Sequence, residues 1–251
     1  MKTPESWHFN GSAENESLRP LCEAAEQHLQ LPVARLCRYF AVTEDAYLLQ
    51  MNGQHYRGFY CHIAERNWLP PYLFDCFFHP PNVFTASSFN SFDEMVAFEH
   101  LIYIRAGTCS DPTGCVATYA HELQHLIQHE RSPRVLRVNN ALYQSLKKYE
   151  PTATASDIPS EREANIVSKK VTEAVCGVEA VKAFAEKQVQ LMEELGNVEQ
   201  RDRWIFFRDV PSSTAYDLLE STLPFIERYK TIIDFGVAVD QPEWWVGPLE
   251  D

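Results

Sequence analysis

The stretch that decides the fold is CVATYAHELQHLIQHE, residues 115–130. On an α-helix, which advances by about 100° per residue, its apolar side chains share one face about 120° wide. These side chains are Val116, Tyr119, Ala120, Leu123, Leu126 and Ile127. His121, Glu122 and His125 fall on the opposite side, together with Thr118. The pattern predicts a helix whose apolar face packs against a core and whose polar face presents two histidines and a glutamate.

The segment His121-Glu122-Leu123-Gln124-His125 has the spacing HExxH. Residues four apart lie on one face of a helix, so both imidazoles can reach the same metal ion. Glu122 lies about 100° around the helix from His121, where its carboxylate can accept a proton from a water bound to the metal. The alternative is a solvated polar face that happens to carry two histidines. The clean separation of apolar and polar faces favours the metal site.

A catalytic zinc ion (Zn2+) held in this way needs a third protein ligand, which leaves the fourth position for water. His129 is about 12 Å from His121 along a straight helix, so we interpret it as exposed or as lining the active-site cleft. The segment SEREAN begins at Ser160 and supplies two better candidates, Glu161 and Glu163. Glu163 also fits a capping box with Ser160. We therefore favour Glu161 as the third ligand and keep Glu163 as the alternative.

The order of these motifs resembles the gluzincin class of zinc metallopeptidases, in which HExxH is followed by a helix that carries a glutamate ligand and an Asp or Asn one turn later. Asn165 matches that last position, from which it can hydrogen-bond a ligating histidine. EREAN (161–165) also resembles, more weakly, the ImmA/IrrE-type family, with motifs HExGH and E-x-x-A-N/D. Gln124 replaces the glycine of that family, and residues 166–177 lack its Phe-Ala and Leu-Leu continuation. The resemblance implies a zincin-like sheet whose edge strand precedes the active-site helix, and His100–Arg105 is placed for that role.

The remaining pattern predicts an α+β fold, with a small mixed or antiparallel sheet followed by a mainly helical second half. Strands are expected at 47–51 and 56–63 around an Asn-Gly turn, at 83–86 and at 100–105. Helices are expected at 18–29, at 33–40, and from residue 133 to Tyr149. Further helices are expected at 160–177, at 179–195, and at 212–233 with a bend at Pro224. We divide the chain into a flexible N-terminus (1–17), a zincin-like domain (18–235) and an acidic aromatic tail (236–251).

Composition excludes several classes of protein. The chain has 22 basic and 35 acidic side chains among 251 residues, a formal net charge of -13. Such a surface repels nucleic acid and anionic lipid, so neither is an expected partner. Seven cysteines with no CxxC pair indicate reduced thiols and a cytoplasmic protein. The pair Cys109 and Cys115 matches no common zinc spacing.

The sequence thus predicts a cytoplasmic zinc endopeptidase that acts on a protein or peptide substrate. His121, His125 and Glu161 bind zinc, and Glu122 is the general base. Four side chains are candidates for stabilising the oxyanion, and the sequence does not choose among them: Tyr143, Tyr149, Tyr216 and Arg228. The alternative is a regulatory or interaction protein that keeps a zincin fold with little or no proteolysis. It would use the helical half or the tail, which contains Trp244 and Trp245, as a surface for a protein partner.

Overall fold

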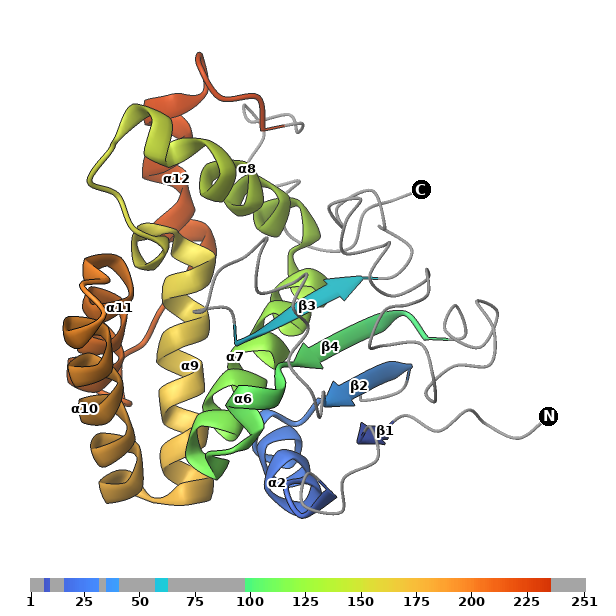
Figure 1. The fold of residues 1–251 in the computed structure, drawn as a ribbon. Coiled ribbons are helices and arrows are strands. Elements are labelled where there is room, and N and C mark those ends of the chain that lie inside the picture. The colour runs from blue at the N-terminus through green and yellow to red at the C-terminus, as the bar shows by residue number, and fades with distance from the viewer. Residues whose placement is uncertain (1–6, 10–15, 32–34, 41–56, 63–97, 236–251) are drawn as a thin grey trace, which may run out of the picture. The chain divides into compact units, whose positions relative to one another are not determined.

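The computed structural model of the chain describes residues 7–9, 16–31, 35–40, 57–62 and 98–235 (Figure 1). The chain forms two compact units, Met1–Leu126 and Ile127–Asp251. The boundary falls inside one helix, α7 (Pro112–Arg131), which runs from the first unit into the second. The predicted domain at 18–235 spans both units. The predicted tail at 236–251 lies outside the described residues.

The described part of the first unit holds a four-stranded mixed sheet in the order β1-β2-β4-β3 (Figure 1). The strands are β1 (Trp7–Phe9), β2 (Leu36–Phe40), β3 (Gly58–His62) and β4 (His100–Ile104). β1 and β4 both pair with β2 in parallel, whereas β3 pairs with β4 in antiparallel fashion. The predicted strand at 100–105 is confirmed, as is the mixed sheet. The other predicted strands, at 47–51 and 83–86, lie outside the described residues.

The helix predicted at 33–40 is wrong, because Leu36–Phe40 is the strand β2. All five of its residues are buried, since β2 has a neighbour on each side and is covered on both faces. A strand buried on both faces lacks the alternation of polar and apolar residues that identifies a half-exposed one. The spacing of Leu36, Cys37 and Phe40 therefore also fits a helix, which is why a helix was predicted here.

The expected position of β4 at the edge of the sheet is also wrong. Among the described strands, β4 lies between β2 and β3, and the antiparallel strand β3 is at the edge. β4 does precede α7, with only the short helix α6 (Ala106–Cys109) between them.

A buried polar cluster attaches α7 and the helix α2 (Arg19–Leu29) to this sheet. The Nε of Arg38, on β2, lies 2.5 Å from a carboxylate oxygen of Glu26 and 3.0 Å from the hydroxyl of Tyr119, on α7. The Trp7 ring stacks on Phe40 and lies against the Arg38 guanidinium, 4.6 Å from its carbon. These contacts explain why 7–9 is a strand, although the N-terminus up to residue 17 was predicted to be flexible.

The second unit is helical in its described part. It contains the end of α7, then α8 (Pro133–Tyr149), a 3₁₀ turn at Ala155–Asp157, and α9 (Pro159–Cys176). These are followed by α10 (Val178–Glu194), α11 (Val198–Asp209) and α12 (Leu218–Tyr229). α8, α9 and α10 match the predicted helices within two residues. The α+β class is confirmed.

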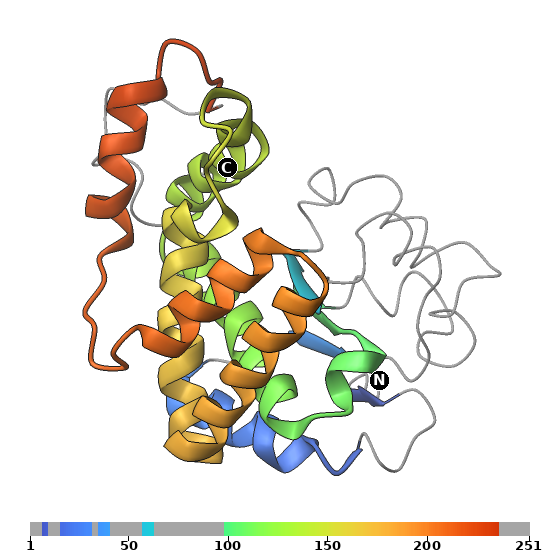
Figure 2. The same cartoon turned by 60° about the vertical axis from the view of Figure 1, so that its left-hand side comes forward.

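Two features of this unit were not predicted. The helix α11 is new, and the helix expected from residue 212 begins only at Leu218, where the side chain of Asp217 accepts the backbone N–H of Glu220. α9, α10 and α11 run side by side in both views (Figure 1, Figure 2). Aromatic rings fix α10 to α11, since the Phe184 and Trp204 centroids are 5.3 Å apart.

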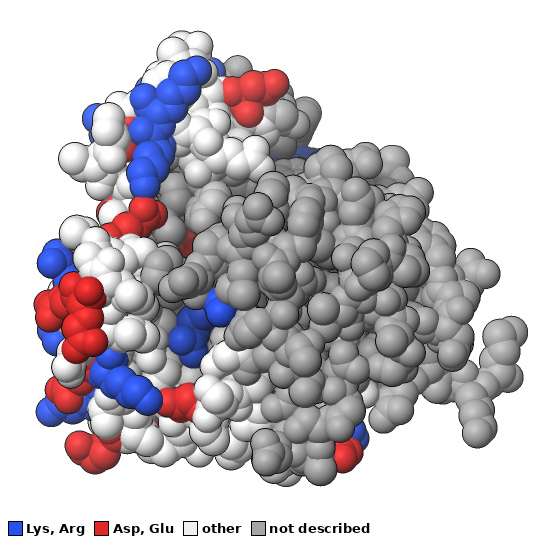
Figure 3. Space-filling view, viewed as in Figure 1, with Lys and Arg blue, Asp and Glu red and all other residues white. Residues whose placement is uncertain are grey.

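The core of the second unit also includes one face of α8. Val135, Val138, Leu142 and Leu146 are buried with residues of α12 and of the segment after it, Ile226, Tyr229 and Ile233 among them. Tyr149, at the end of α8, is exposed. Lysine, arginine, aspartate and glutamate side chains are interspersed on the face shown in Figure 3. Of the helices in the described ranges, none is long and apolar enough to cross a membrane.

Candidate metal centre

The two faces predicted for α7 are present. Its six predicted core residues are all buried, and four of them, including Val116, Tyr119 and Leu123, have no exposed surface. The opposite face is not solvated either, because His121 and Glu122 are only 6% and 7% exposed. Burial of a histidine and a carboxylate side by side is costly unless they have polar or metal partners. The alternative of a solvated polar face therefore does not describe these residues.

The two histidines direct the same ring nitrogen towards each other. The Nε2 atoms of His121 and His125 are 3.1 Å apart, and the ring centroids are 4.8 Å apart with the rings edge to face. Two nitrogen ligands at about 2.0–2.1 Å from a tetrahedral zinc ion lie about 3.3–3.4 Å from each other. The Nε2 pair thus has nearly the separation of two ligands of one ion.

A carboxylate oxygen of Glu161, on α9, completes the group. One ligand atom from each of His121, His125 and Glu161 lies within 4.8 Å of the other two. In the described part of the chain, this is the group that brings three such ligand atoms together. Two imidazole nitrogens and one carboxylate oxygen are a donor set that suits zinc and leaves a coordination position for water.

The residue that caps α9, the helix that carries Glu161, is not the one predicted. The residue that caps the helix is Ile158, with Pro159 in the first turn, and Ser160 lies inside the helix. The capping box of Ser160 with Glu163 is therefore wrong. The Ser160 N–H donates instead to the side-chain oxygen of Asn139, on α8, over 3.0 Å. A side chain from another helix thus replaces the local cap.

Glu163 has a different partner from Glu161. The side-chain amide of Gln128, on α7, donates to the backbone oxygen of Ser160 over 2.9 Å and to a carboxylate oxygen of Glu163 over 2.8 Å. Gln128 is 2% exposed and is three residues after His125 on the same helix. Gln128 therefore holds the residues on both sides of Glu161, while the Glu161 carboxylate forms an ion pair with Arg203 at 3.8 Å.

Gln128, Asn139 and Arg203 were missed by the sequence analysis. Asn139 left a readable signal, since it is an amide with no exposed surface between Val138 and Leu142 on an apolar face. A polar residue in such a place must find a hydrogen-bond partner. The sequence gives a weaker signal for Gln128. It gives none for Arg203, because the helix that carries Arg203 was not predicted.

Other predicted residues have the following positions. His129 is half-buried and lies outside the ligand group. Asn165 is buried, and its side-chain nitrogen makes no hydrogen bond within the described residues, so its predicted bond to a histidine stays a prediction. Cys109 and Cys115 are buried in the first unit and likewise do not belong to the group.

The four oxyanion candidates differ in their surroundings. Tyr143 is 56% exposed, and the hydroxyl of Tyr149 donates to a backbone oxygen of residue 232. Arg228 forms an ion pair with Glu150 at 2.6 Å. Burial raises the pKa of Tyr216 above its ordinary value, and the charges that act on its hydroxyl include those of residues 162 and 163, in the first turn of α9. Of the four, Tyr216 is the one whose pKa depends on residues of the turn that carries Glu161.

We compared the chain with protein-family models, with curated proteins and with solved structures. None of the three comparisons finds a match, so the geometry of the group at His121, His125 and Glu161 stands on its own.

Proposed function

We propose that the protein is a zinc-dependent metallopeptidase of the gluzincin type, which hydrolyses peptide bonds of a protein or peptide substrate. The observation that carries the proposal is the convergence of ligand atoms of His121, His125 and Glu161, with the buried Glu122 directly after His121 on the same helix. A site that only stabilises the fold needs the ligands but not a buried carboxylate beside them. The motifs HELQH and EREAN support the same function through their resemblance to that class.

In this proposal each protein group has a distinct task. Zinc, when bound, supplies a Lewis acid that activates water and polarises the peptide carbonyl. His121, His125 and Glu161 would hold the ion. Glu122 accepts the proton of the attacking water and then delivers it to the departing amine, which is general-base and general-acid work for one carboxylate. Tyr216 is our candidate for a hydrogen bond to the oxyanion.

We also propose that the protein acts in the cytoplasm. The described cysteines are free thiols, and several of them are deeply buried. Burial raises the pKa of Cys61 to about 12, so this thiol stays protonated at neutral pH. Free thiols suit a reducing compartment.

The experiment that tests the function compares the wild type with Glu122→Gln. Elemental analysis of protein prepared without chelator should find about one zinc per chain in both, because Glu122 is not a ligand. Cleavage of a fluorogenic peptide library and of unfolded casein should fall by about 10²–10⁴-fold in Glu122→Gln, because an amide cannot take the proton. Glu130→Gln, the same change at an exposed position of the same helix, is the control and should cleave normally.

Three results would contradict the proposal. A wild type without zinc removes the metal site altogether. Full cleavage by Glu122→Gln means that another group is the base. Loss of zinc in Glu122→Gln means that Glu122 is itself a ligand. A zinc-loaded wild type that cleaves none of these peptides and proteins favours the alternative, a zincin-fold interaction protein.

A further inference from the structure

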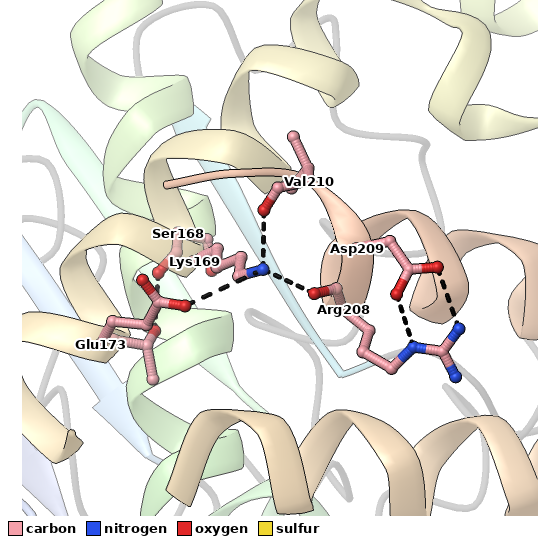
Figure 4. Close-up of polar contacts among 7 residues, drawn as sticks. Ser168, Lys169, Glu173, Arg208, Asp209 and Val210 are labelled. Atoms are coloured by element: carbon pink, nitrogen blue, oxygen red, sulfur yellow. Dashed lines mark hydrogen bonds and ion pairs between the residues drawn. The ribbon is translucent and has the colours of Figure 1, made fainter. Parts of the chain in front are cut away.

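A buried lysine ties the end of α11 to the middle of α9. The Nζ of Lys169 donates to the backbone oxygens of Arg208 and Val210, both over 2.6 Å, and lies 3.8 Å from a carboxylate oxygen of Glu173 (Figure 4). Lys169 is only 8% exposed. The carbonyls at the end of a helix lack partners within it and carry a partial negative charge, which a lysine satisfies well. The contact therefore fixes where α11 ends on α9.

Two more contacts continue from this attachment towards the start of α9. The guanidinium of Arg162 lies over the ring of Phe206, on α11, with its carbon 4.6 Å from the centroid. One turn earlier on α11, the Nη2 of Arg203 lies 3.8 Å from the Oε2 of Glu161. Arg203 is partly buried, with 27% of its side chain exposed, and Phe206 is also partly buried, whereas Arg162 is exposed. The attachment of α11 thus brings one cation of that helix to the carboxylate of the candidate third ligand.

We propose that Arg203 is a positioning residue for Glu161. It holds one carboxylate oxygen, so that the other is directed towards the imidazoles of His121 and His125. A glutamate has three side-chain torsions, and a carboxylate that is already oriented loses less freedom when it binds an ion. Gln128 and Asn139 fix the turn around Glu161, but Arg203 pairs with its carboxylate. This inference rests on the proposed metal site and deepens it.

The test measures zinc affinity of metal-depleted full-length protein by competition with a chromogenic chelator. Arg203→Gln should weaken zinc binding by about 10–100-fold, the usual effect of losing a residue that orients a ligand. Arg203→Lys keeps the charge and should recover part of the affinity. Arg201→Gln is the matched control, because Arg201 is on the same helix but pairs with Asp202, and it should bind zinc as the wild type does.

A double variant shows whether Arg203 acts through Glu161. Once Glu161→Ala has removed the ligand, the further change Arg203→Gln should leave zinc affinity unchanged. A spectroscopic readout separates positioning from a general loss of stability. The visible spectrum of Co²⁺ bound in place of zinc reports the ligand geometry, and it should change in Arg203→Gln but not in Arg201→Gln.

The outcomes distinguish this inference from the function on which it rests. If the wild type binds no zinc, the proposed function fails and the role of Arg203 fails with it. If the wild type binds zinc and both Arg203 variants bind it equally well, only the positioning role is overturned. An equal loss of affinity from Arg203→Gln with and without Glu161 overturns it too, because Arg203 would then act by another route.

Discussion

Glu161 and Glu163 are two residues apart on one helix, yet their partners give them different roles. Glu161 belongs to the ligand group, so Glu161→Ala should weaken zinc binding substantially, as the loss of one of three ligands requires. Glu163 accepts one hydrogen bond from the buried amide of Gln128, so Glu163→Ala should remove that bond and leave the amide only its bond to the Ser160 oxygen. We expect a loss of about 1–3 kcal/mol in the free energy of unfolding. Zinc affinity by chelator competition and stability by urea unfolding measure the two effects.

The reverse outcome would show that Glu163 is the ligand. In that case Glu163→Ala would lose zinc with little change in stability, and Glu161→Ala would be destabilised with its zinc retained. A matched Gln128→Leu variant separates the two contributions, because it removes the same donor without touching either carboxylate. It removes the bonds of the amide to the Ser160 oxygen and to Glu163 together, so it should destabilise the protein at least as much as Glu163→Ala does.

At this scale, sequence reasoning could select candidate residues where the pattern is local. His121, Glu122 and His125 lie on one helix, and their spacing and that of the apolar face are properties of the helix alone. Asn139 and Arg203 contact the first turn of α9 from other helices. Contacts between helices cannot be predicted from the residue pattern of a single segment. For this reason Glu163 was assigned to a cap within its own helix.

At the scale of the elements, the errors have physical causes. The sequence of β2 was predicted to be helical because a strand buried on both faces lacks the alternation of polar and apolar residues. α11 was overlooked because only Trp204 and Phe207 are buried in a run rich in charged residues. Its start did carry a signal, since Asn197 follows Gly196 and its side chain accepts the N–H of Gln200 over 3.0 Å. Asparagine is a strong cap residue, so the segment after Gly196 was open to prediction.

The position of Gly58, on β3, permits another prediction. A Cβ atom on Gly58 would lie 2.7 Å from the backbone oxygen of Tyr103 and 2.9 Å from the Cγ2 of Thr118. The first neighbour is backbone and the second is a buried side chain of α7, so neither yields easily. Gly58→Ala should destabilise the protein by about 1–3 kcal/mol, the usual cost of overpacking. Urea unfolding of the wild type and the variant measures this.

A second substitution tests the cause of that loss. Thr118→Ser removes Cγ2, and in the Gly58→Ala background it should recover part of the stability. The recovery is expected to be incomplete, because the contact with the Tyr103 oxygen remains. A Gly58→Ala protein as stable as the wild type would mean that β3 and α7 approach less closely than described.

At the scale of the whole molecule, the charge pattern and the metal group act on different properties. The net charge of -13 repels other anions at long range. It does not specify a substrate, which depends on the shape and polarity around the metal group. The continuous helix α7 contributes both to the sheet-containing unit, through Tyr119, and to the helical unit, through Gln128. Its histidines lie between these two residues.

The last prediction is that zinc stabilises the folded protein. An ion that binds only the folded chain adds about 2.7 kcal/mol when its free concentration is 100 times its Kd. For a chain of this size, each kcal/mol of stability raises the midpoint of thermal unfolding by about 2–4 °C. Zinc should therefore raise the midpoint by roughly 5–11 °C. Calorimetry with zinc and after chelation measures the shift.

His121→Ala and His125→Ala should each abolish the shift of the unfolding midpoint. His129→Ala should keep it, because one further turn places that ring about 12 Å from His121; a shift lost with His129 instead would show that the ligands on α7 are different from those proposed.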